Sequence, residues 1–589
     1  MKKVLLYTLV VFFSFGCSQQ NKKIGYLTTF AKAYGYVKYF HPSDEAYEIY
    51  WNRFAIYGAA EINKCKNKDD LIETLNALFK PIAPTIEFTD ENHLTNFDIN
   101  QVIPENSNGY CLTYWQHQGV SFGMAEYPVP DSPYESRRVI INCDSINNQL
   151  FDHNPNIEDI ISISIGSGLH CQIPMVVYRN SEGTFPKVDD KLFNELKDNL
   201  ANSSVDPIEI SVRLGNIVNT FNVFQHFYPY FDEVDVNWEQ ELRSALLSSY
   251  SDKDGKDHLI TLQKFTAPLM DGHINVYGTY SDWFRPQITW EWIENQLIIT
   301  KVLDKDIKLQ VGDVITHIDG MRSHKYFEEV YSRISAATDG WLNFRAETTS
   351  LLGPENSIIR VKANGKTIKL IRDDANPYSS MYLSNENLKD FEILDDNTLY
   401  INLEINDSKL KDLLPVLEES NAIIFDARGI PYISFEFITH LLPLDDTTQA
   451  WLQVPLIVFP DQERIVGFDK YDWREFMKVK EPYFGNKKIV FIIDGRAIST
   501  VESYLSYIEG YNLATIIGQP SAGTNGNINL FKLIGGYNIR FTGMKVFKHD
   551  GTQHHGIGIL PDIYVEKTIK GVKEGRDEFL EKAIEIAKN

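Results

Sequence analysis

The chain has 589 residues, of which 43% are hydrophobic and 23% charged, and its formal net charge is −23. This length exceeds a single ordinary core and predicts about three to five domains, while the composition excludes a disordered chain. The strongly negative charge excludes nucleic acid and an anionic membrane surface as electrostatic partners, and leaves peptides as candidates.

The first seventeen residues carry the pattern of an export signal. A basic head (Met1 to Lys3) precedes an apolar run from Val4 to Phe15, and Gly16 is the small residue expected before a cleavage point. The run is short for a membrane span. Because Cys17 follows directly, residues 1–17 predict a lipoprotein-type signal peptide with Cys17 as the lipidation site. Ordinary secretion, with Cys17 incidental, is the alternative interpretation.

Removal of this segment would leave a soluble protein that a lipid tethers to the membrane. The expected location is the bacterial cell envelope, lipid-anchored and facing the periplasm or the surface.

One sequence pattern occurs twice in the first half of the chain. Pro42 precedes Trp51 and Pro229 precedes Trp238, nine residues apart in both copies, with an aromatic cluster before each proline. Each copy predicts a helix stopped at proline, a turn, and a second helix opened near tryptophan. The stretch between them has short aromatic and β-branched runs separated by turn residues, which is typical of short strands. We therefore expect a helical module, a β-rich module and a second helical module at residues 25–95, 96–185 and 205–285.

Residues 286–375 predict a small β-domain. The stretch from Gly312 to Gly320 resembles the Gly-Asp-x-Ile-x-x-Ile-x-Gly signature of PDZ domains, which bind extended peptides by strand addition. The glycine-flanked carboxylate loop that PDZ domains carry is not evident before Leu297. A peptide clamp and a purely structural domain both remain open for this PDZ-like unit.

Residues 376–589 predict an α/β core. Two apolar strands, at residues 398–403 and 422–426, flank a helical stretch at 408–419. A third apolar run, Ile489 to Ile493, reads as a strand buried on both faces. We expect it to lie beside the strand that ends at Asp426.

Ser499 lies between this third predicted strand and a predicted helix that begins at the next residue. From Thr500 onward the apolar residues follow a helical stripe, and Gly510 is placed to stop it. Ser499-x-x-Glu502 matches a capping box, which is one interpretation of the serine. The other is a nucleophile, because free N–H groups at a helix start can hold an oxyanion.

Three ordered blocks carry a family resemblance. They are Gly495 to Glu502, Gly518 to Thr524, and Gly556 to Asp562. Together they resemble the C-terminal-processing and tricorn-type serine peptidase family, and the resemblance extends from about residue 210 onward. It implies a crotonase/ClpP-like peptidase core in which Ser499 is the nucleophile, with Thr500 and Glu502 as supporting residues of its turn.

The same resemblance implies an oxyanion donor at Gly429. The stretch from Ala427 to Pro431 is similar to the family's Arg-Gly-x-Pro-Gly-Gly loop, but Tyr432 and Ile433 replace its last two glycines. An inward-pointing N–H therefore requires residues with a Cβ to tolerate the loop's dihedral angles.

A serine nucleophile also needs a base. One branch of the family uses a lysine where this chain has Thr524, so a serine–lysine dyad is not expected. The tricorn-like branch uses an upstream histidine, and the block ending at His273 matches it. His273 is therefore the candidate base, and a capping or bridging histidine is its alternative role.

The candidate third member of the site is His555, which stands where tricorn-like enzymes carry glutamate. It could orient another group or polarise the substrate, but it cannot directly replace a carboxylate that holds an imidazolium. Asp550-Gly551 predicts a hairpin turn, with His554 and His555 on the strand that leaves it. The histidines lack an H-E-x-x-H or cysteine pattern, so no metal or other cofactor is expected.

The sequence thus predicts a multidomain α/β protein: an exported serine endopeptidase that cleaves peptides or unfolded proteins through Ser499 and His273. The alternative is a catalytically inactive envelope lipoprotein that binds peptides or another ligand on the same fold. The altered glycine loop and the missing glutamate favour that alternative. Capture of the serine by a fluorophosphonate probe would separate the two.

Overall fold

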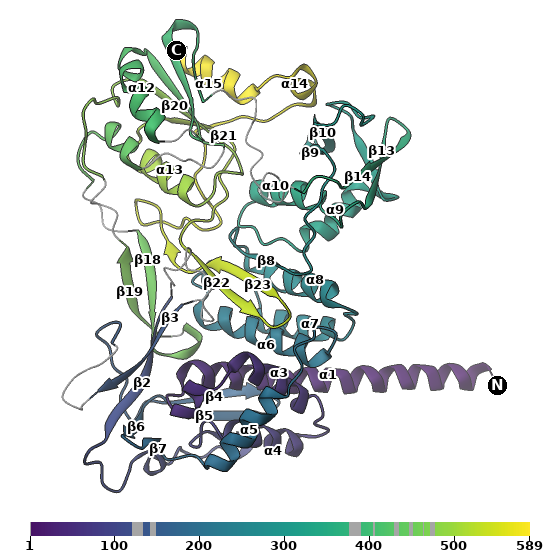
Figure 1. Ribbon diagram of the computed structural model, residues 1–589, viewed down its shortest axis with the longest axis vertical. Coiled ribbons are helices and arrows are strands. Elements are labelled where there is room, and N and C mark those ends of the chain that lie inside the picture. The colour runs from purple at the N-terminus through teal and green to yellow at the C-terminus, as the bar shows by residue number, and fades with distance from the viewer. Residues whose placement is uncertain are drawn as a thin grey trace.

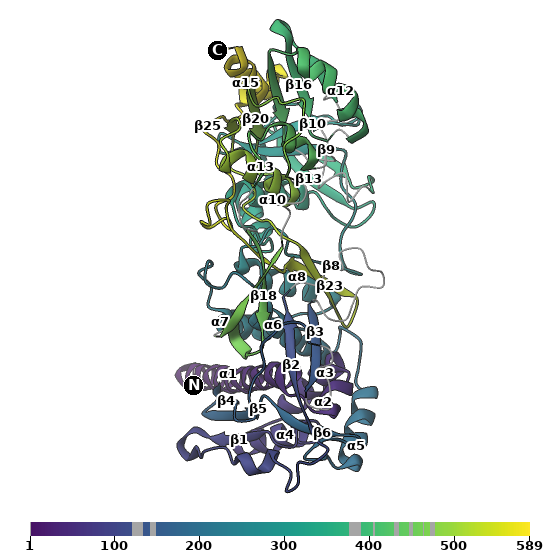
Figure 2. The same ribbon diagram turned by 90° about the vertical axis from the view of Figure 1, so that its left-hand side faces the viewer.

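The fold was analysed in a computed structural model. The structure describes residues 2–119, 134–141, 149–375, 390–404, 407–428, 435–446, 451–462, 464–471 and 477–588. The molecule is elongated (Figures 1 and 2), with a helical region at one end, an α/β core at the other, and a small β-rich unit beside the core. The N-terminal helix projects sideways from the helical end (Figure 1).

The helical end combines both copies of the repeated sequence pattern. Its helices are α1 (Lys2–Phe40), α2 (Asp44–Glu48), α3 (Trp51–Ile62), α4 (Lys68–Phe79), α5 (Asp190–Ala201), α6 (Ile210–Phe227), α7 (Trp238–Ser249) and α8 (Gly255–Thr266). Helix α6 packs against α1, α3 and α7, and one continuous core joins them. A Cβ atom on Gly215 would lie 2.7 Å from the Ile56 backbone, so glycine permits the close α3–α6 crossing. None of the described helices has both the length and the apolar character needed to cross a bilayer.

Two antiparallel sheets cover this region. One has the strand order β1 (Glu87–Asp90), β5 (Leu169–Pro174) and β4 (Ile160–Gly166). The other has the order β19 (Ile465–Tyr471), β18 (Leu452–Ile457), β2 (Cys111–Gln118), β6 (Val177–Asn180) and β7 (Gly183–Phe185), with β3 (Glu135–Ile141) beside β2 and β24 (Lys545–Val546) beside β18. Strands from the stretch expected to form the catalytic core therefore complete a sheet of the β-rich stretch.

The small β-rich unit contains two sheets and two helices. Its hairpin pairs β9 (Ile288–Ile293) with β10 (Gln296–Val302), and its four-stranded sheet has the order β12 (Met321–Arg322), β11 (Ile315–Ile318), β13 (Ile358–Ala363) and β14 (Lys366–Ile371). Helices α9 (Ser323–Tyr331) and α10 (Asp339–Thr349) pack with them around buried Trp290 and Phe327. The first turn of α10 reaches the α/β core.

The α/β core is built on a six-stranded sheet. Its order is β15 (Phe391–Ile393), β16 (Thr398–Asn402), β17 (Ala422–Asp426), β20 (Lys488–Ile493), β21 (Thr515–Gly518) and β25 (Ile563–Tyr564), and every neighbouring pair except β15–β16 is parallel. The helices of the core are α12 (Asp407–Glu419), α13 (Thr500–Gly510), α14 (Ile569–Glu574) and α15 (Glu578–Lys588).

Alternate residues of the central strands enter two different cores. Phe425 and Phe491 pack on the side of α13, whereas Ile424 and Val490 pack on the side of α15. Burial on both faces explains the unbroken apolar runs in the sequence. The expectation that β17 and β20 are neighbours is confirmed, and because they are parallel their carboxyl ends meet at one edge.

A separate three-stranded sheet joins distant parts of the chain. Strands β22 (Ile528–Leu533) and β23 (Tyr537–Thr542) form a hairpin, and β23 pairs in an antiparallel manner with β8 (Asn275–Gly278). This sheet lies between the helical end and the α/β core (Figure 1). Because β8 follows His273 directly, the pairing brings that histidine to the core.

Candidate active site

Ser499 occupies a strained turn between β20 and α13. Its backbone has φ 59° and ψ −117°, a region that costs a non-glycine residue about 1–3 kcal/mol and persists only where the surroundings enforce it. The Ser499 N–H lies 2.9 Å from the Thr524 carbonyl oxygen and 3.2 Å from a Glu502 carboxylate oxygen. The serine is half-buried and the following Thr500 is exposed. The serine therefore lies in a strained turn directly before a helix, five residues after Asp494, the first residue beyond β20.

Glu502 holds the turns around the serine together. Its side chain is fully buried, and one oxygen accepts hydrogen bonds from the Ser521 hydroxyl (2.5 Å) and the Gly523 N–H (2.7 Å). The other oxygen accepts from the Thr524 N–H (3.0 Å) as well as from Ser499. The capping-box interpretation of Glu502 is therefore correct but incomplete, because the carboxylate also fixes the second family block.

Thr524 connects the turn at Ser499 (the serine turn) to the turn at Gly272 and His273 (the histidine turn). Its carbonyl oxygen accepts from Ser499, and its hydroxyl oxygen accepts from the Gly272 N–H at 3.0 Å. The residue that replaces a lysine base thus has a structural role. Thr524 thus bonds both the turn that carries Ser499 and the turn that carries His273. No hydrogen bond between the Ser499 and His273 side chains is present among the described contacts.

His273 is buried, and among the described residues one of its ring nitrogens, Nδ1, has a hydrogen-bond partner. Only 7% of the residue is exposed, and Nδ1 lies 2.9 Å from the Thr542 hydroxyl oxygen. Burial, assisted by the positive charge of Arg540, lowers the pKa of His273 to about 3. The imidazole is therefore neutral at pH 7 and has a free lone pair, but its affinity for a proton is lower than that of an ordinary histidine.

His554 and His555 lie deep in the structure beside Glu502. The predicted strand is wrong here: an isolated bridge between Phe547 and Gln553 closes the hairpin, and the chain then turns, since the Gly558 N–H donates to the His554 carbonyl. His554 Nε2 is 3.5 Å from Glu502 Oε1. The glycines at positions 556 and 558 have positive φ values, which a strand cannot accommodate.

The ring of His555 stacks on Tyr230, with 3.9 Å between the ring centroids. Burial, followed by the neighbouring His554, Lys545 and His273 side chains, lowers the pKa of His555 to about 3. Its ring nitrogens have no hydrogen-bond partner in the described part of the chain. His555 is therefore a neutral group near His273, and not an anion like the glutamate it replaces.

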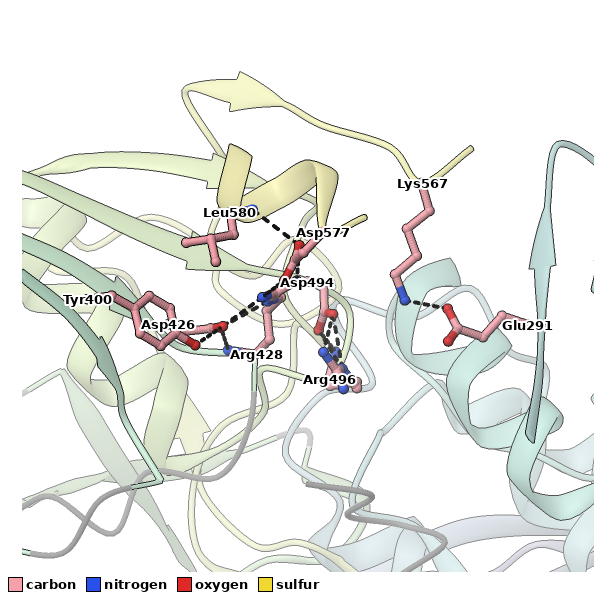
Figure 3. A network of polar contacts seen from close by, with 9 residues as sticks. All are labelled: Glu291, Tyr400, Asp426, Arg428, Asp494, Arg496, Lys567, Asp577 and Leu580. Carbon is pink, nitrogen blue, oxygen red and sulfur yellow. Dashed lines mark hydrogen bonds and ion pairs between the residues drawn. The ribbon is translucent and has the colours of Figure 1, made fainter. Parts of the chain in front are cut away.

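The oxyanion candidate Gly429 lies outside the described residues, as do Tyr432 and Ile433. The described end of that loop is fixed by Arg428, which bonds Asp426 (2.7 Å) and Asp577 (2.7 Å), while the Tyr400 hydroxyl donates to Asp426 (Figure 3). Burial opposes the charge of Arg428, but the two carboxylates outweigh it and raise the pKa of the guanidinium. Cys17, the lipidation candidate, lies within α1.

Helix α10 of the small β-rich unit supports the site from a third direction. The Trp341 indole N–H donates to the Gly272 carbonyl oxygen at 3.1 Å, and its ring packs against Ile498. A Cβ on Gly495 would lie 2.4 Å from the carbonyl carbon of Gly340, so the two backbones touch. Nearby, Lys567 pairs with Glu291 of β9 at 2.5 Å (Figure 3). The small unit therefore contacts both the serine turn and the histidine turn.

Sequence reasoning missed three residues of this neighbourhood: Asp271, Thr542 and Trp341. Asp271 lies in the block that identified His273, so its position was a usable signal. Thr542 and Trp341 carry no local motif, and only the tertiary fold brings them to the histidine turn.

A strained serine at the start of a helix, in a turn that Thr524 links to the turn of a buried neutral histidine, is the kind of arrangement that serine-type hydrolases use. Residues 447–565, which include Ser499, match the model of peptidase family S41. This match, over the part of the chain that carries the serine turn, supports a serine-type peptidase whose substrates are proteins or peptides.

Two solved structures have a similar fold. Mature CPAF complexed with lactacystin has a TM-score of 0.51 and 13% sequence identity, over 64% of this chain and 98% of that chain. Mature CPAF alone has a TM-score of 0.50 and 12% identity, again over 64% and 98%. At these identities the likeness concerns the fold. Comparison with curated proteins gave no match.

Proposed function

We propose that this protein is an exported serine endopeptidase in which Ser499 is the nucleophile and His273 the general base. The observation that carries the proposal is Thr524, which accepts hydrogen bonds from both catalytic turns, at 2.9 Å and 3.0 Å. The neutral state of His273 fits the role of proton acceptor.

In the proposed reaction, His273 takes the proton of the Ser499 hydroxyl while the serine oxygen attacks the peptide carbonyl. The protonated imidazole then gives that proton to the leaving amine, and water hydrolyses the acyl-enzyme by the same route. As the first residue of α13, Thr500 has no intrahelical acceptor for its N–H. We assign this N–H and that of Gly429 to the oxyanion, with Glu502 holding the serine turn in place.

A fluorophosphonate probe tests the nucleophile directly, because covalent capture requires an activated serine. We expect labelling of the wild-type protein, loss of labelling in Ser499→Ala, and normal labelling in the control Ser244→Ala, which changes an exposed serine of α7. Peptide hydrolysis should fall by roughly 10⁴-fold or more in Ser499→Ala and in His273→Ala, and the double variant should lose little more.

Two results would contradict this proposal. Activity that survives Ser499→Ala in a purified sample would remove the serine from the reaction. A folded wild-type protein that neither reacts with the probe nor hydrolyses peptides would instead be a catalytically inactive peptide- or ligand-binding protein on this fold.

We also propose that Cys17 carries a lipid and anchors the protein in the bacterial cell envelope. The support is the sequence pattern of residues 1–17. Mass spectrometry of the mature N-terminus should find an acylated Cys17, and Cys17→Ser should release the protein from membranes. An intact Met1 on native protein would contradict the anchor.

The unit at residues 286–375 is a candidate PDZ-like domain that would present a peptide or unfolded protein to the core. Its signature glycine and aspartate, Gly312 and Asp313, lie just before β11. Binding of extended peptides to a Ser499→Ala protein, and loss of that binding on deletion of the unit, would support this role.

A further inference from the structure

The family position for a carboxylate partner of the histidine is occupied by His555, yet a buried carboxylate lies close to His273 through another residue. Asp271 is fully buried. Its Oδ1 atom accepts from the His273 backbone N–H at 2.9 Å and from the Thr542 hydroxyl at 2.8 Å, and its Oδ2 atom accepts from the Thr542 N–H at 2.7 Å. Three donors therefore converge on this carboxylate.

The hydrogen-bond directions follow from counting protons. A threonine hydroxyl carries one hydrogen, and that of Thr542 points to the Asp271 carboxylate, which can only accept when ionised. The Thr542 oxygen must therefore accept from His273 Nδ1, which is 2.9 Å away. This assigns the proton of neutral His273 to Nδ1 and leaves the lone pair on Nε2.

The topology accounts for the position of Thr542. In the ladder between β23 and β8, Arg540 faces Asn275 and the register is antiparallel. Continuing that register by two residues places Thr542 opposite His273. The strand pairing thus sets the hydroxyl beside the imidazole, although the two residues are 269 positions apart in the chain.

The three donors that converge on Asp271 favour its ionised form, although its pKa remains above the ordinary value because the side chain is buried. Burial raises the pKa of Asp271, and its bonds from Thr542 and the His273 backbone oppose that rise. His273 faces the charge of Arg540 from β23 and lies near neutral His555, and burial keeps its own pKa at about 3. Tyr228 and Tyr230, near Asp271, have pKa values raised by burial and so stay neutral.

We propose that Asp271 and Thr542 are positioning residues, which hold His273 in the Nδ1-protonated tautomer so that Nε2 receives the proton of the nucleophile. The inference rests on the proposed function of His273 as the base. In a direct pair the carboxylate bonds the imidazole itself, whereas here the threonine hydroxyl relays its effect.

The tautomer can be measured without any activity. In protein with ¹⁵N-labelled histidine at pH 7, His273 should show a protonated Nδ1 and an unprotonated Nε2, with its signals assigned by their absence from His273→Gln. Thr542→Val keeps the backbone N–H and the volume but removes the hydroxyl, so it should populate the other tautomer. Thr542→Ser should restore the wild-type spectrum, and Thr367→Val, which changes an exposed strand threonine, is the control.

The proposed positioning role also predicts changes in the kinetic constants of the same variants. Thr542→Val should lower kcat by at least about tenfold while KM stays within about twofold, because the base and not substrate binding is affected. Thr542→Ser should stay within about threefold of wild type, and Asp271→Asn should resemble Thr542→Val in its histidine spectrum.

An unchanged His273 spectrum and unchanged kcat in folded Thr542→Val would overturn the relay while leaving Ser499 and His273 in their roles. A wild-type His273 that carries its proton on Nε2 would overturn it as well. If instead Ser499→Ala kept full activity, the proposed function would fail, and the spectra would still decide whether Asp271 and Thr542 fix the tautomer.

Discussion

Replacement of Glu502 by glutamine isolates the function of one buried charge. The carboxylate accepts four hydrogen bonds, two at each oxygen, from the Ser499, Gly523 and Thr524 backbones and from the Ser521 hydroxyl. Glutamine has nearly the same shape, but one oxygen becomes an NH₂ group, which can only donate.

Either orientation of the amide leaves a backbone donor without an acceptor. If NH₂ replaces Oε2, it faces the Thr524 N–H, while Ser499 keeps its bond to the Thr524 carbonyl. If NH₂ replaces Oε1, it faces the Gly523 N–H. One orphaned buried donor costs about 1–3 kcal/mol, and the loss of charge-assisted bonds adds a similar amount, so we expect a loss of about 2–5 kcal/mol in the free energy of unfolding.

Urea denaturation of Glu502→Gln, beside the rate of fluorophosphonate labelling, measures both consequences. The matched control is Glu509→Gln on the same helix, whose carboxylate bonds Lys548 at 2.8 Å near the surface and should change stability by about 0–1 kcal/mol. We expect slower labelling only in Glu502→Gln, because only this variant loosens the serine turn. A Glu502→Gln protein within about 0.5 kcal/mol of wild type would refute the assigned network, since even one orphaned buried donor costs more.

Three further predictions concern the surroundings of the site. Gly495→Ala should lower the urea midpoint and slow labelling, because its Cβ would lie 2.4 Å from Gly340, whereas Gly467→Ala, with no atom within 4 Å, should change neither. His555→Phe, which preserves the stacked ring but removes its nitrogens, should lower kcat by about tenfold or more if His555 belongs to the reaction, and normal kcat would remove it from the site. The free energy of unfolding should decrease as the pH is lowered below about 6.5, because histidines in the unfolded chain bind protons there, whereas the buried histidines of the folded protein stay neutral down to about pH 3–4. Each such histidine should lower the free energy of unfolding by about 1.4 kcal/mol per pH unit. A urea midpoint that is equal at pH 7 and pH 5 would contradict this. The buried histidines whose pKa values are lowered to about 3–4 are His41, His117, His226, His273 and His555, and burial also lowers the pKa of His258.

The part of the site that local sequence could predict is the serine turn. The apolar run before Asp494 had to be an internal strand, and the apolar stripe after Thr500 had to face the core, as Val501 and Leu505 do. Both rules depend on side-chain periodicity within a few residues. The position of β20 beside β17 followed from the same burial argument.

The remainder depends on pairing between segments that no local pattern relates. No local sequence pattern near Thr542 indicates that it contacts His273, because this contact depends on the register between β8 and β23. The hairpin turn at Asp550-Gly551 predicts a strand through His554 and His555, but the chain turns there instead. Gly556 and Gly558 adopt positive φ values that a strand does not have, and His554 lies 3.5 Å from Glu502.

The pairing of β8 with β23 also has a consequence for biosynthesis. The histidine turn is synthesised well before β23 (Tyr537–Thr542), since Thr542 follows His273 by 269 positions. Segments synthesised first begin to fold first, but β8 has no β23 partner until that later segment has been made. A chain truncated before Tyr537 therefore lacks the strand that positions His273, and under the proposed mechanism it should not cleave peptides.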